Sequence, residues 1–249
     1  MQVLEQGHIY FFYRPRVETH QPESAEEIQR LYMVLHPRDQ KKYRMIVIGR
    51  KKLPDAAQSG RQKYWGFVDR VVSDPKQLEE ESFKEQHYDT ATRGERTQPA
   101  ARPAGEGVYA IVDHDSHAHL AYVLELPKEL GPVQEATNIA EEASYVIAIK
   151  NPELPAPLEV GLSESQEAQY PKSLQQNFEG KRFIPPAPHL LDYEGAELIL
   201  ISAAEDVEAD LGLELDAEHE SGRSAAIFKD LRLEKGAHPL EPLFSGEWA

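Results

Sequence analysis

The sequence contains no cysteine, and that absence excludes disulfides, thiol nucleophiles and thiolate metal sites. No apolar run approaches the roughly 20 residues that a membrane-spanning helix needs. The first residues also lack the basic start and apolar stretch of a signal peptide. We therefore expect a cytoplasmic protein with no membrane partner.

Specific catalytic motifs are missing as well. The glycines at 94, 105 and 107 have neither the spacing nor the lysine of a phosphate-binding loop. No serine lies in a nucleophile-elbow pattern. The sequence therefore indicates no particular enzyme class.

The chain does contain a sequence pattern that occurs twice. Three apolar, tyrosine-marked runs at 8–10, 32–37 and 43–48 recur in the same order at 107–109, 122–127 and 145–149. Their composition is typical of β-strands. We predict an α+β fold built by internal duplication, in which two related, mostly antiparallel β modules with short helices precede an acidic tail. The predicted boundaries are 1–85 for the first module, 86–106 for a connector, 107–203 for the second module and 204–249 for the tail.

Charge is divided unevenly along the chain, whose formal net charge is −16. The first 100 residues contain 17 basic and 15 acidic side chains, whereas residues 192–220 contain eleven acids and no lysine or arginine. Such asymmetry indicates either an interaction tail or a tail that folds back on a basic face.

The predicted tail alternates acids with aliphatics and ends with Leu243, Phe244 and Trp248. Acidic segments that end in apolar side chains are suited to docking onto basic grooves, because electrostatic attraction guides the encounter. Our leading hypothesis is a non-enzymatic adaptor or regulatory protein that holds a protein partner through these three side chains and the cleft between modules. Removal of residues 204–249 is then expected to leave folding intact and to abolish partner capture. The alternative is a tail that docks on its own core.

A basic stretch offers a second hypothesis, that of a nucleic-acid-binding protein with an autoinhibitory acidic tail. The predicted anion-binding residues are Arg44, Arg50, Lys51, Lys52, Arg93 and Arg96. Neighbouring tyrosines offer stacking surfaces beside the charge. A solvated or tail-binding face explains the same residues. Connector arginines, Arg102 among them, suit either bridging of the modules or a cleft for an anionic ligand.

A third hypothesis is a metal-dependent hydrolase that uses the cluster at 113–119. His114, His117 and His119 are the predicted ligands of a divalent metal, the one cofactor that the sequence suggests. Their spacing matches no specific metal motif, and a polar hairpin turn explains the cluster equally well.

Overall fold

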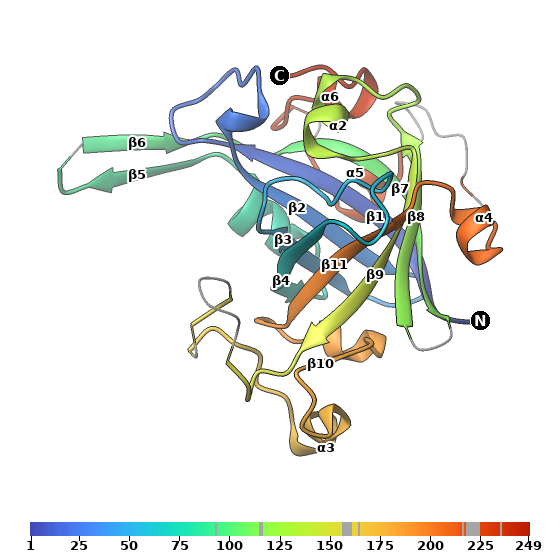
Figure 1. The fold of residues 1–249 in the computed structure, drawn as a ribbon. Coiled ribbons are helices and arrows are strands. Elements are labelled where there is room, and N and C mark those ends of the chain that lie inside the picture. Colours follow the sequence, from blue (N-terminus) through green and yellow to red (C-terminus); the bar gives the residue numbers. More distant parts are fainter. Residues whose placement is uncertain are drawn as a thin grey trace.

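The computed structural model describes residues 1–92, 94–114, 117–155, 161–163, 165–215, 217, 225–234 and 236–249. Within these ranges, eight strands form a closed antiparallel barrel in the order β9-β11-β4-β3-β2-β1-β7-β8, and pairing of β8 with β9 closes it (Figure 1). The barrel strands are β1 (Gln2–Pro15), β2 (Ile28–Pro37), β3 (Tyr43–Ile48), β4 (Lys63–Val72), β7 (Arg102–His114), β8 (His117–Leu126), β9 (Glu142–Lys150) and β11 (Glu197–Ala204). The short strand β10 (Phe183–Ile184) pairs with the other edge of β9.

The predicted α+β fold of two packed modules is wrong. The strands of the two similar runs belong to one barrel, because β1 pairs with both β2 and β7. They enclose a single interior core to which every barrel strand contributes. An antiparallel meander produces alternating apolar runs at regular intervals with or without duplication, so the pattern in the sequence does not establish a repeat.

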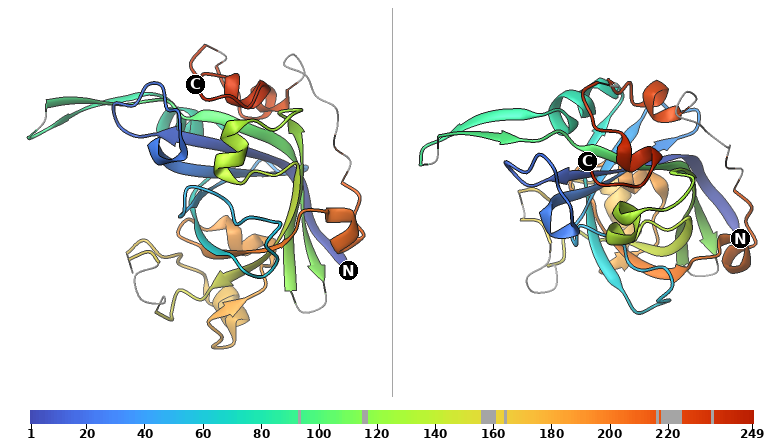
Figure 2. Two further views of the ribbon diagram at one scale, coloured as in Figure 1. Left: turned by 45° about the horizontal axis from the view of Figure 1, so that its top comes forward. Right: turned by 90° about the horizontal axis from the view of Figure 1, so that it is seen from above.

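Elements outside the barrel are short. The hairpin of β5 (Gln86–Thr90) and β6 (Gly94–Gln98) projects as an arm away from the barrel (Figures 1 and 2). None of the described helices is long and apolar enough to cross a membrane. The helical segments are η1 (Ala25–Glu27), α1 (Lys76–Leu78), η2 (Glu79–Phe83), α2 (Pro132–Thr137), α3 (Lys172–Gln175), η3 (Gln176–Phe178), η4 (Pro188–Asp192), α4 (Val207–Leu211), α5 (Ala226–Asp230) and α6 (Glu241–Phe244).

Strand β1 is buried on both of its faces. Side chains alternate across a strand, so Ile9 and Phe11 point into the barrel while Tyr10 and Phe12 point outward. The outward pair is nevertheless fully buried. Double burial explains why the sequence from Ile9 to Tyr13 is continuously apolar and aromatic instead of alternating with polar residues.

The C-terminal segment, which we define as residues 225–234 and 236–249, covers the outer face of β1, β2 and β3. Ile227, Leu231 and Leu243 pack there in one buried cluster with aromatic side chains of these strands. Figure 2 shows the red end of the chain lying along the barrel. Because this segment buries apolar surface, we expect its removal to destabilise the barrel, in contrast to the expectation from the sequence that folding survives.

A charged network lies inside one end of the barrel. Arg44 of β3 donates two hydrogen bonds to Glu5 of β1, at 2.6 and 3.0 Å, and a third of 2.7 Å to Asp192. Tyr109 of β7 also donates to Glu5, at 2.7 Å. Only 1% of the Arg44 side chain and 6% of Glu5 are exposed. The network links three strands and η4 with charge-assisted bonds, and its Arg44–Glu5 pair is buried while Asp192 at its edge is partly exposed.

This burial predicts unequal costs for two neighbouring substitutions. Arg44→Met should lower the free energy of unfolding by about 3–5 kcal/mol, because it leaves buried Glu5 without its cation. Lys42→Met removes a more exposed pair with Asp192 and should cost less than about 1 kcal/mol. Urea unfolding of both variants measures the difference. Equal costs would show that the Arg44 network contributes no more than a surface ion pair.

Candidate functional site

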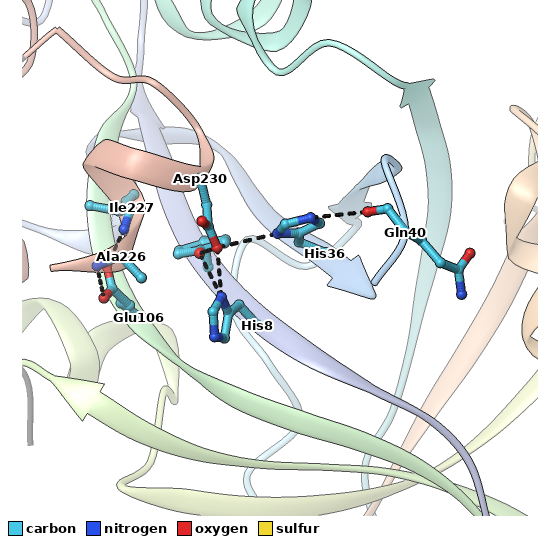
Figure 3. Close-up of polar contacts among 8 residues, drawn as sticks. His8, His36, Gln40, Glu106, Ala226, Ile227 and Asp230 are labelled. Carbon is cyan, nitrogen blue, oxygen red and sulfur yellow. Dashed lines mark hydrogen bonds and ion pairs between the residues drawn. The ribbon is translucent and has the colours of Figure 1, made fainter. Parts of the chain in front are cut away.

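Two histidines face each other across β1 and β2 on the outer face of the barrel. His8 and His36 are direct partners in the antiparallel register, which places their side chains on the same face. Asp230, at the end of α5, reaches the two rings from the C-terminal segment (Figure 3). Residues that are 222 positions apart in the sequence therefore meet in one polar cluster above an apolar face.

One carboxylate oxygen of Asp230 is the centre of this cluster. The Nδ1 atom of His8 lies 2.6 Å from Asp230 Oδ2, and the hydroxyl of Tyr10 donates to the same oxygen at 2.8 Å. The Nδ1 atom of His36 lies 3.3 Å from it. On its other side, His36 contacts the carbonyl oxygen of Gln40 through Nε2, at 3.2 Å. We call His8, Tyr10, His36 and Asp230 the Asp230 latch.

A second carboxylate orients α5 above the barrel. Glu106 of β7 is fully buried and accepts hydrogen bonds from the backbone amides of Ala226 and Ile227, at 2.6 and 2.9 Å. These amides belong to the first turn of α5, where backbone N–H groups have no carbonyl acceptor within the helix. Glu106 thus fixes one end of the five-residue helix, and the Asp230 latch holds the other.

Electrostatics in the latch favour the ion pair. The hydrogen bond that His8 donates to Asp230 raises the pKa of His8 above its usual value, although partial burial opposes the shift. Burial alone would raise the pKa of Asp230, but hydrogen bonds from His36, His8 and Tyr10 outweigh it and hold that pKa well below the usual range. Burial and the nearby carboxylates raise the pKa of Tyr10, so its hydroxyl stays a donor.

A further histidine anchors the C-terminal segment away from the latch. His238 is buried, with Nδ1 2.6 Å from the carbonyl oxygen of Ala101 and Nε2 2.9 Å from a carboxylate oxygen of Glu79. Both ring nitrogens therefore face oxygen atoms. Because a carbonyl can only accept, the contact with Glu79 requires either an imidazolium or a protonated carboxyl group.

The predicted partner-binding residues lie on the barrel. Leu243 is fully buried in the outer cluster, and Phe244 packs against the same cluster while remaining partly exposed. Trp248 is partly exposed and packs edge-on against the Tyr13 ring at 5.4 Å between centroids. In this arrangement the three side chains cover the core of their own chain.

The predicted anion-binding residues do not gather at one place. Arg44 is inside the barrel, the Arg50 guanidinium stacks 5.8 Å from the centroid of Tyr64, and Lys51 donates to the carbonyl of Ile28. Lys52 is half-buried beside Lys51, and Arg96 is on the arm, 3.4 Å from Glu18. Arg93 falls outside the described residues.

Arg102, the connector arginine, lines a surface cleft of about 710 Å³ together with His20, Lys84 and Glu241. Its guanidinium donates to two backbone carbonyls, those of Ala100 and His20. The Nε atom is buried and has no hydrogen-bond partner. The expectation of a cleft for an anionic ligand stays a prediction.

The predicted metal ligands lie on the β7–β8 hairpin. His114 and His117 are paired across the strands, and His119 is largely buried with its ring centroid 5.9 Å from that of His114. Its Nδ1 atom lies 3.6 Å from Asp210. Among the described residues, the group that brings three ligand atoms of histidine or carboxylate within 4.8 Å of one another is a different one, formed by His8, His36 and Asp230.

Sequence reasoning missed this group. His8 and His36 are 28 positions apart in the sequence, and only the register of β1 with β2 joins them. No pattern in the sequence placed Asp230 on β1. Two histidines at equivalent outward positions of consecutive strands were the available sign.

Comparison of the chain with protein-family models, with curated proteins and with solved structures found no match. The function is therefore inferred from the geometry of the chain itself.

The pKa shifts predict how the latch responds to pH. Because the pKa of His8 is raised, protonated His8 contributes fully to the stability of the latch below pH 6.5, its ordinary pKa. This contribution is lost as the pH rises through the raised pKa. Because the pKa of Asp230 is lowered, its carboxylate contributes to the stability of the latch above pH 3.8, its ordinary pKa. This contribution is lost only as the pH falls through the lowered pKa. The latch should therefore be strongest between these two ordinary values.

Hydrogen exchange at the Leu231 amide, which donates to Ile227 inside α5, measures this response. After correction for the intrinsic exchange rate, protection should decline from pH 6 toward alkaline pH. The Asp230→Asn variant should show a flatter profile. The same pH dependence in the variant would exclude the latch as its origin.

Proposed function

We propose that the chain is a non-enzymatic, cytoplasmic interaction protein whose C-terminal segment docks a protein partner when the Asp230 latch opens. The barrel is the scaffold, and the segment is the regulated element. The observation that carries this proposal is the convergence of His8, Tyr10 and His36 on one carboxylate that belongs to a short helix. The strength of such a contact depends on protonation near neutral pH, which is typical of switching elements.

The surfaces that would separate also support an interaction role. On the barrel side they are the outward side chains of β1 and β2, such as Phe12 and Val34. On the segment side they include Phe228, Leu243 and Phe244. Exposure of both apolar surfaces is costly in water, so an open state is stable only when a partner covers them.

The interior of the barrel gives no comparable support for catalysis. Tyr109, Tyr122 and Tyr145 point into it among aliphatic side chains and are almost completely buried. Eight-stranded barrels either fill with side chains or hold a small ligand, and the described side chains here belong to the filled kind.

Substitution of the latch tests the proposal. Asp230→Asn removes the charge and preserves the shape of the side chain, so the segment should dissociate more readily. Full-length protein that carries it should recover more of a discrete partner from nuclease-treated native lysate than the wild type does. Adding Phe244→Ala to the same variant should reduce that recovery, because Phe244 belongs to the proposed docking surface.

Asp210→Asn is the matched control. Asp210 also lies on a short helix against the barrel and accepts a hydrogen bond from Ser144, but it belongs to α4 and contacts β8 and β9 instead of β1 and β2. Equal recovery by the wild type and both Asp variants would refute the docking proposal. Recovery that disappears with nuclease would favour the nucleic-acid hypothesis.

A further inference from the structure

We propose that His8, His36 and Asp230 bind a divalent transition-metal ion of the zinc class. These three residues also belong to the Asp230 latch. Metal binding itself is independent of the proposed function, whereas its effect on the docking of the segment rests on that function. Each residue contributes one ligand atom, and the three atoms lie within 4.8 Å of one another. Two imidazole nitrogens and one carboxylate oxygen form a ligand set that binds zinc, cobalt and nickel in preference to calcium and magnesium, which favour oxygen ligands.

The two distances from histidine nitrogens to the Asp230 oxygen are close to those of a tetrahedral site. Zinc lies about 2.0–2.2 Å from nitrogen and oxygen ligands, which puts neighbouring ligand atoms roughly 3.3 Å apart. The Nδ1 atom of His36 is 3.3 Å from Asp230 Oδ2. The His8 Nδ1 atom is 2.6 Å from the same oxygen, so it needs to move outward by only a fraction of an ångström. The partly exposed ring of His8 has room for that movement.

The hydrogen bond of His36 to Gln40 prepares the ring for a cation. A carbonyl oxygen can only accept, so Nε2 of His36 carries a proton. Nδ1 therefore donates to Asp230 Oδ2 only when the ring is an imidazolium; in the neutral ring Nδ1 is unprotonated, and its lone pair faces Asp230 Oδ2, which is also an acceptor. Two acceptors repel unless a proton or a metal ion lies between them. Metal-binding histidines commonly donate their second ring nitrogen to a backbone carbonyl in this way.

Neighbouring charges also favour a cation. Glu106 of β7 and Glu125 of β8 act on His8 at longer range and favour positive charge there. Tyr10 donates to the Asp230 oxygen and lies 3.4 Å from His8 Nδ1, where it can orient the carboxylate. Three protein ligands leave the fourth position of a tetrahedral ion for water, which the partly exposed His8 side admits.

Metal binding would join β1, β2 and α5 directly, because His8, His36 and Asp230 lie on these three elements. The His8 Nδ1 proton that bonds to Asp230 would be released on binding. A zinc-loaded chain should therefore keep α5 on the barrel at pH 8.

Calorimetric titration of chelator-treated, full-length protein with zinc chloride tests the site. We expect one ion per chain, with proton release that appears as a dependence of the heat on the buffer. His36→Gln and Asp230→Asn should each weaken binding by about 100-fold or more, because loss of a direct ligand exceeds the 10–100-fold typical of a ligand's supporting hydrogen bond. Cobalt binding should give the visible absorption of a tetrahedral ion.

His117→Gln is the control variant, since it removes an imidazole from the predicted hairpin cluster instead. It should bind zinc as the wild type does. No zinc binding by the wild type, or binding that survives His36→Gln and is lost in His117→Gln, would overturn the proposal. Circular dichroism of each variant verifies that the fold is intact, and both positions are at least partly exposed.

Hydrogen exchange at Leu231 separates this inference from the proposed function. Zinc should restore protection of α5 at pH 8 in the wild type and not in His36→Gln. Zinc binding without a change in the hydrogen-exchange protection of Leu231 would support the metal site and refute its role in the latch. A wild type that binds no zinc, while Asp230→Asn still increases partner capture, would refute the metal site alone.

Discussion

The outer face of β1, β2 and β3 is apolar, and the rest of the structure depends on covering it. A barrel strand ordinarily needs burial only on its inward side. Here Tyr10 and Phe12 are as deeply buried as their inward neighbours, because the C-terminal segment and Phe83 of η2 pack over this face. Hydrophobic burial therefore places the segment, and the polar contacts decide how firmly it stays.

Two groups of charged residues show how burial divides these tasks. The Arg44–Glu5 pair is closed to solvent, and its partners cannot separate without leaving a charge inside the barrel. The Asp230 latch lies at the edge of the outer cluster, with His8 more than a third exposed. Water, protons and ions reach it, so its strength can change while the barrel stays intact. Similar residue types thus stabilise the fold in one place and create a responsive contact in another.

The sequence predicted local structure better than it predicted architecture. The runs around Tyr10, Val34 and Ile46 are strands as expected, because β-branched and aromatic residues favour the pleated conformation. Closure of the barrel could not be predicted, since it depends on β8 pairing with β9 and on β1 pairing with β7. The same limit hid the latch, because the meeting of His8, His36 and Asp230 follows from strand register and from the docking of a distant segment.

The position of β1 in the chain has a consequence for synthesis on the ribosome. Its outward partner residues, such as Ile227 and Leu243, leave the ribosome only after the other barrel strands have been made. Until then the outward aromatic face of β1 is covered only in part, by side chains such as Phe83 of η2, and exposed apolar strands are prone to aggregate. The order of synthesis thus leaves part of the apolar surface of β1 exposed until residues 225–249 have emerged and can pack on it.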